Sequence, residues 1–165
     1  MQDQPKYIPL RQSTFFGDAR SARPLVPGTV ARGHLHDDTL LETGKVGKDD
    51  ATMFPFPVDA RVIERGRERY DIFCSPCHGR TGGGDGMIVR RGFRHPPSYH
   101  EERLRNAAVG HFVDVMTNGF GAMADYRQQV DARDRWAIAA YIRALQLSEH
   151  ATLADMPADE RAKLR

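Results

Sequence analysis

Cysteine is scarce in this sequence. Only Cys74 and Cys77 occur among 165 residues. A chain with one close pair of thiols is not a disulfide-rich scaffold, and it has no second cysteine pair to complete a four-cysteine zinc site. Any special role for cysteine therefore belongs to this one pair.

Long apolar runs and charge of one sign are also missing. No stretch approaches the roughly 20 apolar residues that a transmembrane helix needs. The formal net charge is only +2, which gives no indication of nucleic-acid binding. The first residues, MQDQP, have neither the basic start nor the apolar centre of a signal peptide.

The two cysteines form a motif with the histidine that follows them. Residues 74–78 read CSPCH, the pattern at which haem c is attached. Each thiol adds to one vinyl group of the haem, and His78 is placed to bind the iron. The alternative is a redox disulfide of the thioredoxin type, but that motif requires a βαβ context, which is absent, and it leaves His78 unexplained. We therefore predict one covalent haem c on Cys74 and Cys77, with His78 as an iron ligand.

The haem prediction sets an expectation for location. Haem c is attached outside the cytoplasm, in bacteria in the periplasm. We therefore expect the chain to be a processed form, and a lipid-bearing cysteine is an option for what precedes it.

Residues 1–57 differ in composition from the rest of the chain. They hold six of the ten prolines, and no helical or strand period persists in them. We predict a long, irregular, extended N-terminal arm. Two interpretations remain open: a flexible tether, and an arm whose scattered apolar residues, such as Phe15 and Phe16, lie on partner subunits.

Residues 58–148 are predicted to be an all-α domain, followed by a polar tail over 149–165. Asp59 is a good N-cap for a helix that runs into the haem motif, with Gly66 inside it. Apolar residues at helical spacing predict a last helix over about 132–146. Because glycine is unfavourable inside a helix, Gly66 indicates close contact with another helix. The glycine-rich run at 79–86 lacks the ending of a phosphate-binding loop, so we predict a tight backbone loop beside the haem.

A second iron ligand is expected from methionine, as is common in electron-transfer cytochromes. Met123 is the best candidate because it lies in a glycine-flanked loop before the last helix. Met87 is too close to His78, Met116 fits a helix core, and Met156 lies in the tail. His100 and His111 remain alternatives. We also expect the carbonyl of Pro96 or Pro97 to accept a hydrogen bond from His78, since metal-bound histidines usually have such a partner.

These residues resemble the class I cytochrome c fold, in which a helix bearing Gly66 and Tyr70 crosses a C-terminal helix bearing Ile138 and Tyr141. Nearly the whole chain is similar to the mono-haem cytochrome c subunit of alternative complex III, a bacterial quinol:electron-acceptor oxidoreductase. The segments that carry this resemblance are QPKY at 4–7, FF at 15–16, RSARP at 20–24, GTVARG at 28–33, RGRERYDIF at 65–73, GMIV at 86–89 and NGFGAM at 118–123.

The resemblance implies a function and a setting. The family's haem ligands map onto His78 and Met123, although Ala124 stands where the family would have proline. It implies a non-enzymatic subunit that relays single electrons from quinol oxidation to a cytochrome c or a terminal oxidase. The subunit would lie on the periplasmic side of the bacterial inner membrane, next to a multihaem neighbour, with its arm on other subunits. The alternatives are a free-standing diffusible periplasmic cytochrome c and a haem enzyme such as a peroxidase, which would need an open iron position.

Overall fold

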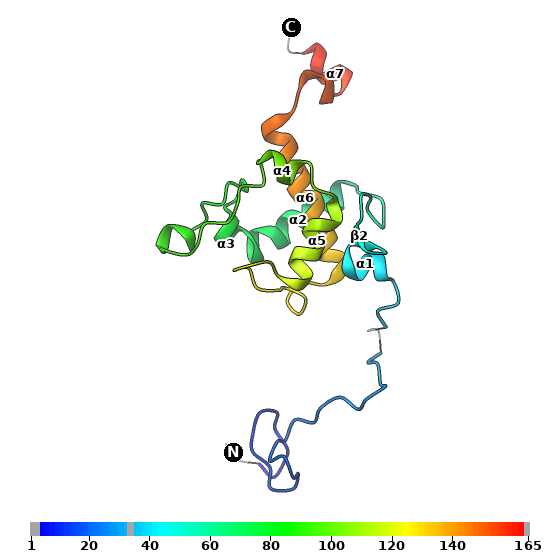
Figure 1. The fold of residues 1–165 in the computed structure, drawn as a ribbon, viewed down its shortest axis with the longest axis vertical. Coiled ribbons are helices and arrows are strands. Elements are labelled where there is room, and N and C mark those ends of the chain that lie inside the picture. Colours follow the sequence, from blue (N-terminus) through cyan, green and yellow to red (C-terminus); the bar gives the residue numbers. More distant parts are fainter. Residues whose placement is uncertain (1–3, 33–34, 164–165) are drawn as a thin grey trace. The chain divides into compact units, whose positions relative to one another are not determined.

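The computed structural model describes residues 4–32 and 35–163. The chain divides into two units, Met1–His36 and Asp37–Arg165, and the second contains every helix and strand named below (Figure 1). Each unit is described by itself.

The helix that precedes the cysteines begins where the sequence predicts. Helix α2 runs over Ala60–Phe73, and the Asp59 side chain accepts a hydrogen bond from the backbone amide of Val62 at 2.9 Å. This contact satisfies one of the amides that a helix start leaves without a partner. The inward side of α2 carries Gly66 and Tyr70, both buried.

Helix α2 crosses the last long helix at Gly66. Helix α6 runs over Ala132–His150, and a side chain at Gly66 would collide with the backbone carbonyl of Ala137. The crossing predicted from Gly66 is therefore confirmed. Helix α6 ends four residues later than the predicted Gln146, because no glycine or proline interrupts the chain there and His150 Nδ1 contacts the Gln146 carbonyl oxygen at 3.1 Å.

A third helix completes the core. Helix α5 spans Val109–Asn118 and ends at Gly119, as the Asn-Gly pair predicts. Its buried side chains pack with Trp136, Ile138 and other residues of α6 in one apolar cluster. The remaining helical pieces are short: α3 (Ser75–His78), η1 (Val89–Arg91), α4 (Glu102–Arg105), η2 (Leu153–Asp155) and α7 (Ala158–Ala162). The described part of the chain holds no helix long and apolar enough to cross a bilayer.

Residues 37–57 fold onto the helices, which differs from the prediction of one arm over 1–57. They contain helix α1 (Thr39–Thr43) and a two-stranded antiparallel hairpin, β1 (Lys45–Val46) and β2 (Asp49–Asp50). The compact unit thus begins at Asp37 rather than at residue 58. We call residues 37–57 the strap.

Long-range hydrogen bonds hold the strap. The Trp136 indole donates to the carbonyl of Leu41 at 2.8 Å, and buried Arg135 donates to the carbonyl of Glu42 at 3.1 Å. The amide of Gly110 donates to the carbonyl of Ala51 at 2.8 Å. The bonds to Leu41 and Glu42 satisfy carbonyls at the end of α1 that the helix itself leaves free. The strap is therefore an integral layer of the domain.

The unit Met1–His36 has local order but little core. Gln12 and Arg20 form an antiparallel bridge, and the guanidinium of Arg23 lies 4.2 Å from the ring centroid of Phe16. Most of its large apolar side chains are exposed, with Leu10 at 97% and Phe15 at 76%. An irregular N-terminal segment is thus found for these residues, but it is a turn-rich unit and not a simple extended strand.

Candidate haem-attachment site

The two cysteines and the histidine lie on one helical turn. Helix α2 ends at Phe73, Cys74 caps the short helix α3, and the amide of His78 donates to the Cys74 carbonyl at 2.9 Å. Because residues three apart on a turn share a side, Cys74 and Cys77 face the same way. Both are free thiols in this structure. The disulfide alternative is therefore not formed here.

His78 is buried and electrically neutral. Its exposed fraction is 9%, and burial lowers its pKa to about 4. The ring stacks on Tyr99 with centroids 4.7 Å apart and an interplanar angle of 11°. Neutral imidazole is the form that binds metals. The site thus presents a histidine in its ligating state at physiological pH.

The expected hydrogen-bond partner of His78 is not found. Buried Nδ1 has no partner among the residues described, so the prediction that a carbonyl of Pro96 or Pro97 accepts from it is wrong for this structure. The Pro96 carbonyl instead lies against Gly84, where a side chain would collide with it at 2.5 Å. A buried ring nitrogen without a partner is costly in free energy.

The glycine-rich segment after His78 is a tight backbone loop, as predicted. The Tyr70 hydroxyl donates to the Gly79 carbonyl at 2.7 Å, and the Gly84 amide donates to the His78 carbonyl at 2.8 Å. Gly79 and Gly84 have φ of 74° and 87°, values that favour glycine. The loop thus holds the histidine's backbone from both sides.

Tyrosines that sequence reasoning did not single out complete the site. The centroid of the Tyr99 ring lies 6.3 Å from that of Tyr70 and 6.0 Å from that of Phe112. Burial raises the pKa of Tyr99 well above its usual value, and it also raises that of Tyr126. Neutral rings therefore surround the cysteine turn. The only signal in the sequence was an aromatic residue directly after the Pro96–Ser98 turn.

Met123 lies where a loop turns back on itself before α6. Phe120 and Met123 exchange two backbone hydrogen bonds of 3.0 Å, and Met123 packs partly buried against the core. Met116 is buried within α5, as predicted, and Met87 is exposed. The loop is thus the kind of segment expected for a ligand, and iron binding by Met123 stays a prediction.

The residues present fit haem c. Two free thiols lie on one side of a turn and a neutral buried imidazole follows them. The side chain of Met123 packs against the same apolar cluster as Cys74. The described residues contain no group of three or more histidine, cysteine or acidic side chains able to hold a metal ion by themselves. When bound, haem c supplies one-electron oxidation and reduction of its iron.

Part of this chain is similar to a known protein family. Residues 61–142 match the family model described as cytochrome c oxidase, cbb3-type, subunit III. This chain contains a cytochrome c domain. The match covers α2, the cysteine turn, the Met123 loop and most of α6, and it does not include the strap.

Two further comparisons add less. No curated protein matches this sequence. Among solved structures, a chain of the reducing HAO-like protein complex of Kuenenia stuttgartiensis is similar at 22% identity with a TM-score of 0.49. The match covers 57% of this chain and 48% of that chain, so the present sequence spans about half of the solved one.

The cytochrome c domain indicates the general role. It implies electron transfer through covalently attached haem c, and an electron carrier rather than a catalyst.

Proposed function

We propose that this cytochrome is the mono-haem subunit of an alternative complex III. It relays single electrons from quinol oxidation to a cytochrome c or a terminal oxidase, on the periplasmic side of the bacterial inner membrane. Within that complex its electron donor is a multihaem cytochrome. Cys74 and Cys77 attach the haem, and His78 and Met123 bind its iron.

The observation that carries this proposal is the apolar surface of the unit Met1–His36. Large side chains there are exposed although the unit has almost no core. They are Tyr7, Leu10, Phe15, Leu25, Val26, Val30 and Leu35. Each such side chain forgoes about 1.5–3 kcal/mol that burial would supply. A diffusing electron carrier has no need of this surface, whereas a subunit can bury it against its neighbours.

The resemblance of residues outside the cytochrome c domain supports the same assignment. The segments at 4–7, 15–16, 20–24 and 28–33 all precede residue 61, where the family match begins. Membrane association would then come through the complex, with an N-terminal lipid as a further anchor.

The test is purification of the chain with its neighbours. We expect mild detergent extraction of the tagged full chain to recover a multihaem cytochrome and quinol-oxidising activity. The triple variant L10S/F15S/L25S should lose these partners and keep its haem. The matched control V46S/L153S changes exposed apolar residues outside this unit and should keep them.

The diffusible carrier is the second candidate. A native chain that is fully soluble and monomeric, and whose removal leaves the membrane's quinol oxidation intact, would favour it and contradict membership of the complex.

A further inference from the structure

The strap meets α5 through a close contact of backbones. A side chain at Gly110 would collide with the carbonyl of Gly44 and with the amide of Ala51. The Ala51 amide donates to the Gly44 carbonyl, and the Gly110 amide donates to the Ala51 carbonyl, both at 2.8 Å. Two of these three residues are glycines, which bring no side chain to the junction. The side chains beside the contact are charged.

Lys45 on β1 lies between two carboxylates. Its Nζ is 2.9 Å from Asp50 Oδ1 on β2 and 3.1 Å from Asp114 Oδ2 on α5. Hydrogen bonds to these two carboxylates raise the pKa of Lys45, which therefore stays positively charged. One ammonium group thus serves two negative charges, one on the strap and one on the helix.

His111 is the remaining member of this cluster, and its charge depends on pH. Its Nδ1 lies 3.5 Å from Asp50 Oδ2, the oxygen that does not face Lys45. The second oxygen of Asp114 accepts a hydrogen bond from the uncharged Asn118 amide at 2.7 Å. Histidine gains its proton between about pH 8 and about pH 5, so the cluster changes from one surplus negative charge to a balance. We call Lys45, Asp50, His111 and Asp114 the clasp.

Other charged side chains on the neighbouring helices have partners of their own. On α1, Glu42 faces Arg135 of α6, with 3.6 Å between their charged groups. On α6, Arg143 lies over the ring of Phe112 and donates to backbone carbonyls within 104–107. The balance of charge around the imidazole is therefore determined within the clasp.

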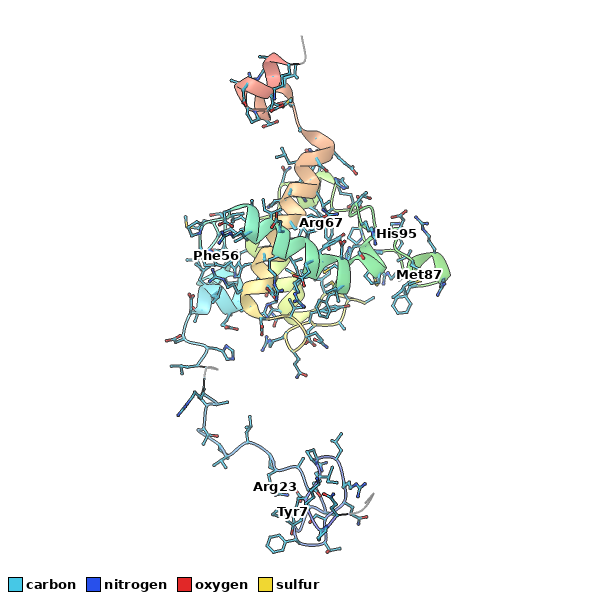
Figure 2. The ribbon with its side chains drawn as sticks, turned by 180° about the vertical axis from the view of Figure 1, so that it is seen from behind. Tyr7, Arg23, Phe56, Arg67, Met87 and His95 are labelled. Carbon is cyan, nitrogen blue, oxygen red and sulfur yellow. The ribbon has the colours of Figure 1, made fainter. Side chains whose placement is uncertain are left out.

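The clasp lies apart from the haem-attachment turn. Figure 1 shows β2 and α1 at one side of the domain and α3 at the other. Figure 2 separates Phe56 of the strap from Met87 and His95 in the same way. The contacts of the clasp are therefore made on a side of the domain away from the two cysteines.

We propose that the clasp is a pH-sensitive device that fastens the strap to α5 more firmly when His111 is protonated. A proton on the imidazole completes an ion pair with Asp50 and removes the surplus negative charge that Asp50 shares with Asp114. The four side chains are only 26–31% exposed, so salt and water screen this pair less than a pair on an open surface. The backbone hydrogen bonds at the junction should therefore open less often as pH falls.

Hydrogen–deuterium exchange of the haem-loaded full chain tests this proposal, with each rate divided by the intrinsic rate at the same pH. From about pH 8 to about pH 5, protection of the Ala51 and Gly110 amides should rise about three- to fivefold, as expected of a partly exposed ion pair. About 0.5 M salt should reduce the rise. Amides in the middle of α6 report global unfolding and should not follow it. An equal rise in α6, or none at the junction, would contradict the clasp.

Two substitutions of His111 separate its charge from its shape. H111Q cannot become charged, so the pH dependence at the junction should disappear. H111K carries a permanent charge, so it should give at pH 8 the protection that the native chain reaches at pH 5. A merely structural role of the imidazole predicts no such rescue. If H111Q keeps the native pH dependence, or if H111K behaves as H111Q does, the proposal is overturned.

A matched control and a partner variant complete the test. H150Q removes a histidine at the end of α6, where Nδ1 of His150 contacts the Gln146 carbonyl oxygen. This control should keep the native pH dependence at the junction. D50N removes the carboxylate that His111 faces and should lose that dependence. A loss in H150Q as large as that in H111Q would assign the effect to the charge of the whole domain and would rule out the clasp.

Discussion

Tyr70 shows how one side chain can couple the helix core to the cysteine turn. Its ring lies buried in the core cluster, and its hydroxyl donates to the carbonyl of Gly79, the residue after His78. A buried carbonyl that loses its donor costs about 1–3 kcal/mol. Tyr70 therefore contributes to the stability of the loop as well as to the core.

We expect Tyr70→Phe to lower the free energy of unfolding by about 1–3 kcal/mol at pH 7. Burial raises the pKa of Tyr70 above its ordinary range, so the folded state favours the neutral phenol. This contribution is complete below the unfolded pKa of about 10 and is lost as pH rises from there toward the folded pKa. The difference between native and variant should thus shrink above about pH 10, as measured by denaturant unfolding. Tyr7→Phe, on an exposed ring, is the control, and a constant difference across pH would contradict the argument.

The second residue-scale prediction concerns Met123. If its sulfur binds the iron, Met123→Ala should keep the covalent haem, lower the midpoint potential by on the order of 0.1 V or more, and allow carbon monoxide to bind. Potentiometric titration and absorption spectra measure both effects. Met116→Leu changes a buried methionine of α5 and should leave the potential as it is. An unchanged potential in Met123→Ala would move the ligand elsewhere.

The sequence indicated candidate residues for the site, and it did not indicate the contacts that they make. CSPCH and the Met123 loop were recognisable because each is defined by residues that are close together in the sequence: the spacing of the cysteines and histidine, and the glycines on either side of Met123. The stacking of Tyr99 on His78 and the missing partner of Nδ1 were not, because both depend on how segments far apart in the chain meet.

At the scale of elements, the crossing of α2 and α6 is determined by the absence of one side chain. Gly66 lets the Ala137 carbonyl approach the backbone of α2. That contact was predictable, because glycine destabilises the middle of a helix and its presence there indicates that another segment packs closely against it. Helix ends were less predictable: α6 continues to His150 because nothing in its sequence stops it earlier.

We expect Gly66→Ala to destabilise the domain by about 1–3 kcal/mol, because the added methyl group collides with backbone that cannot rotate away. Its gain in helix propensity, about 1 kcal/mol, offsets only part of this cost. Thermal and denaturant unfolding measure the change. Glu64→Ala, an exposed position on the same helix, should change stability by less than about 0.5 kcal/mol. Equal or greater stability in Gly66→Ala would contradict the crossing.

The strap is the element that the sequence did not reveal. Its anchors are donors on α6, such as Trp136 to the Leu41 carbonyl across 95 positions, and the strap itself has no long helical or strand period. Its prolines at 55 and 57 indicated irregular chain, which is what they produce, but irregular chain can still be buried and hydrogen-bonded.

At the scale of the whole molecule, the chain separates into a part that makes the domain stable and a part that does not. The strap contributes Leu40, Leu41, Phe54 and Phe56 to the packing around the core, and Ala51 to the core itself. The unit Met1–His36 has its own local contacts and exposes most of its apolar side chains.

We therefore expect two deletions to behave differently. Removal of residues 1–36 should leave the thermal unfolding of the domain nearly unchanged and abolish association with the proposed complex. Removal of residues 1–57 should cost at least about 3 kcal/mol, since several large apolar side chains leave the packing. Calorimetry on both haem-loaded proteins measures the effect. Equal stabilities of the two deletions would show that the strap adds nothing.

The strap also has a mechanical consequence. Any force applied at the N-terminus travels along the chain and reaches the anchors at Leu41, Glu42 and Ala51 before it reaches α2. Several hydrogen bonds spread over two helices bear that load together. If the chain is held at its N-terminal unit, as proposed above, a pull there would strain the strap before it reached the helix that leads to the cysteine turn.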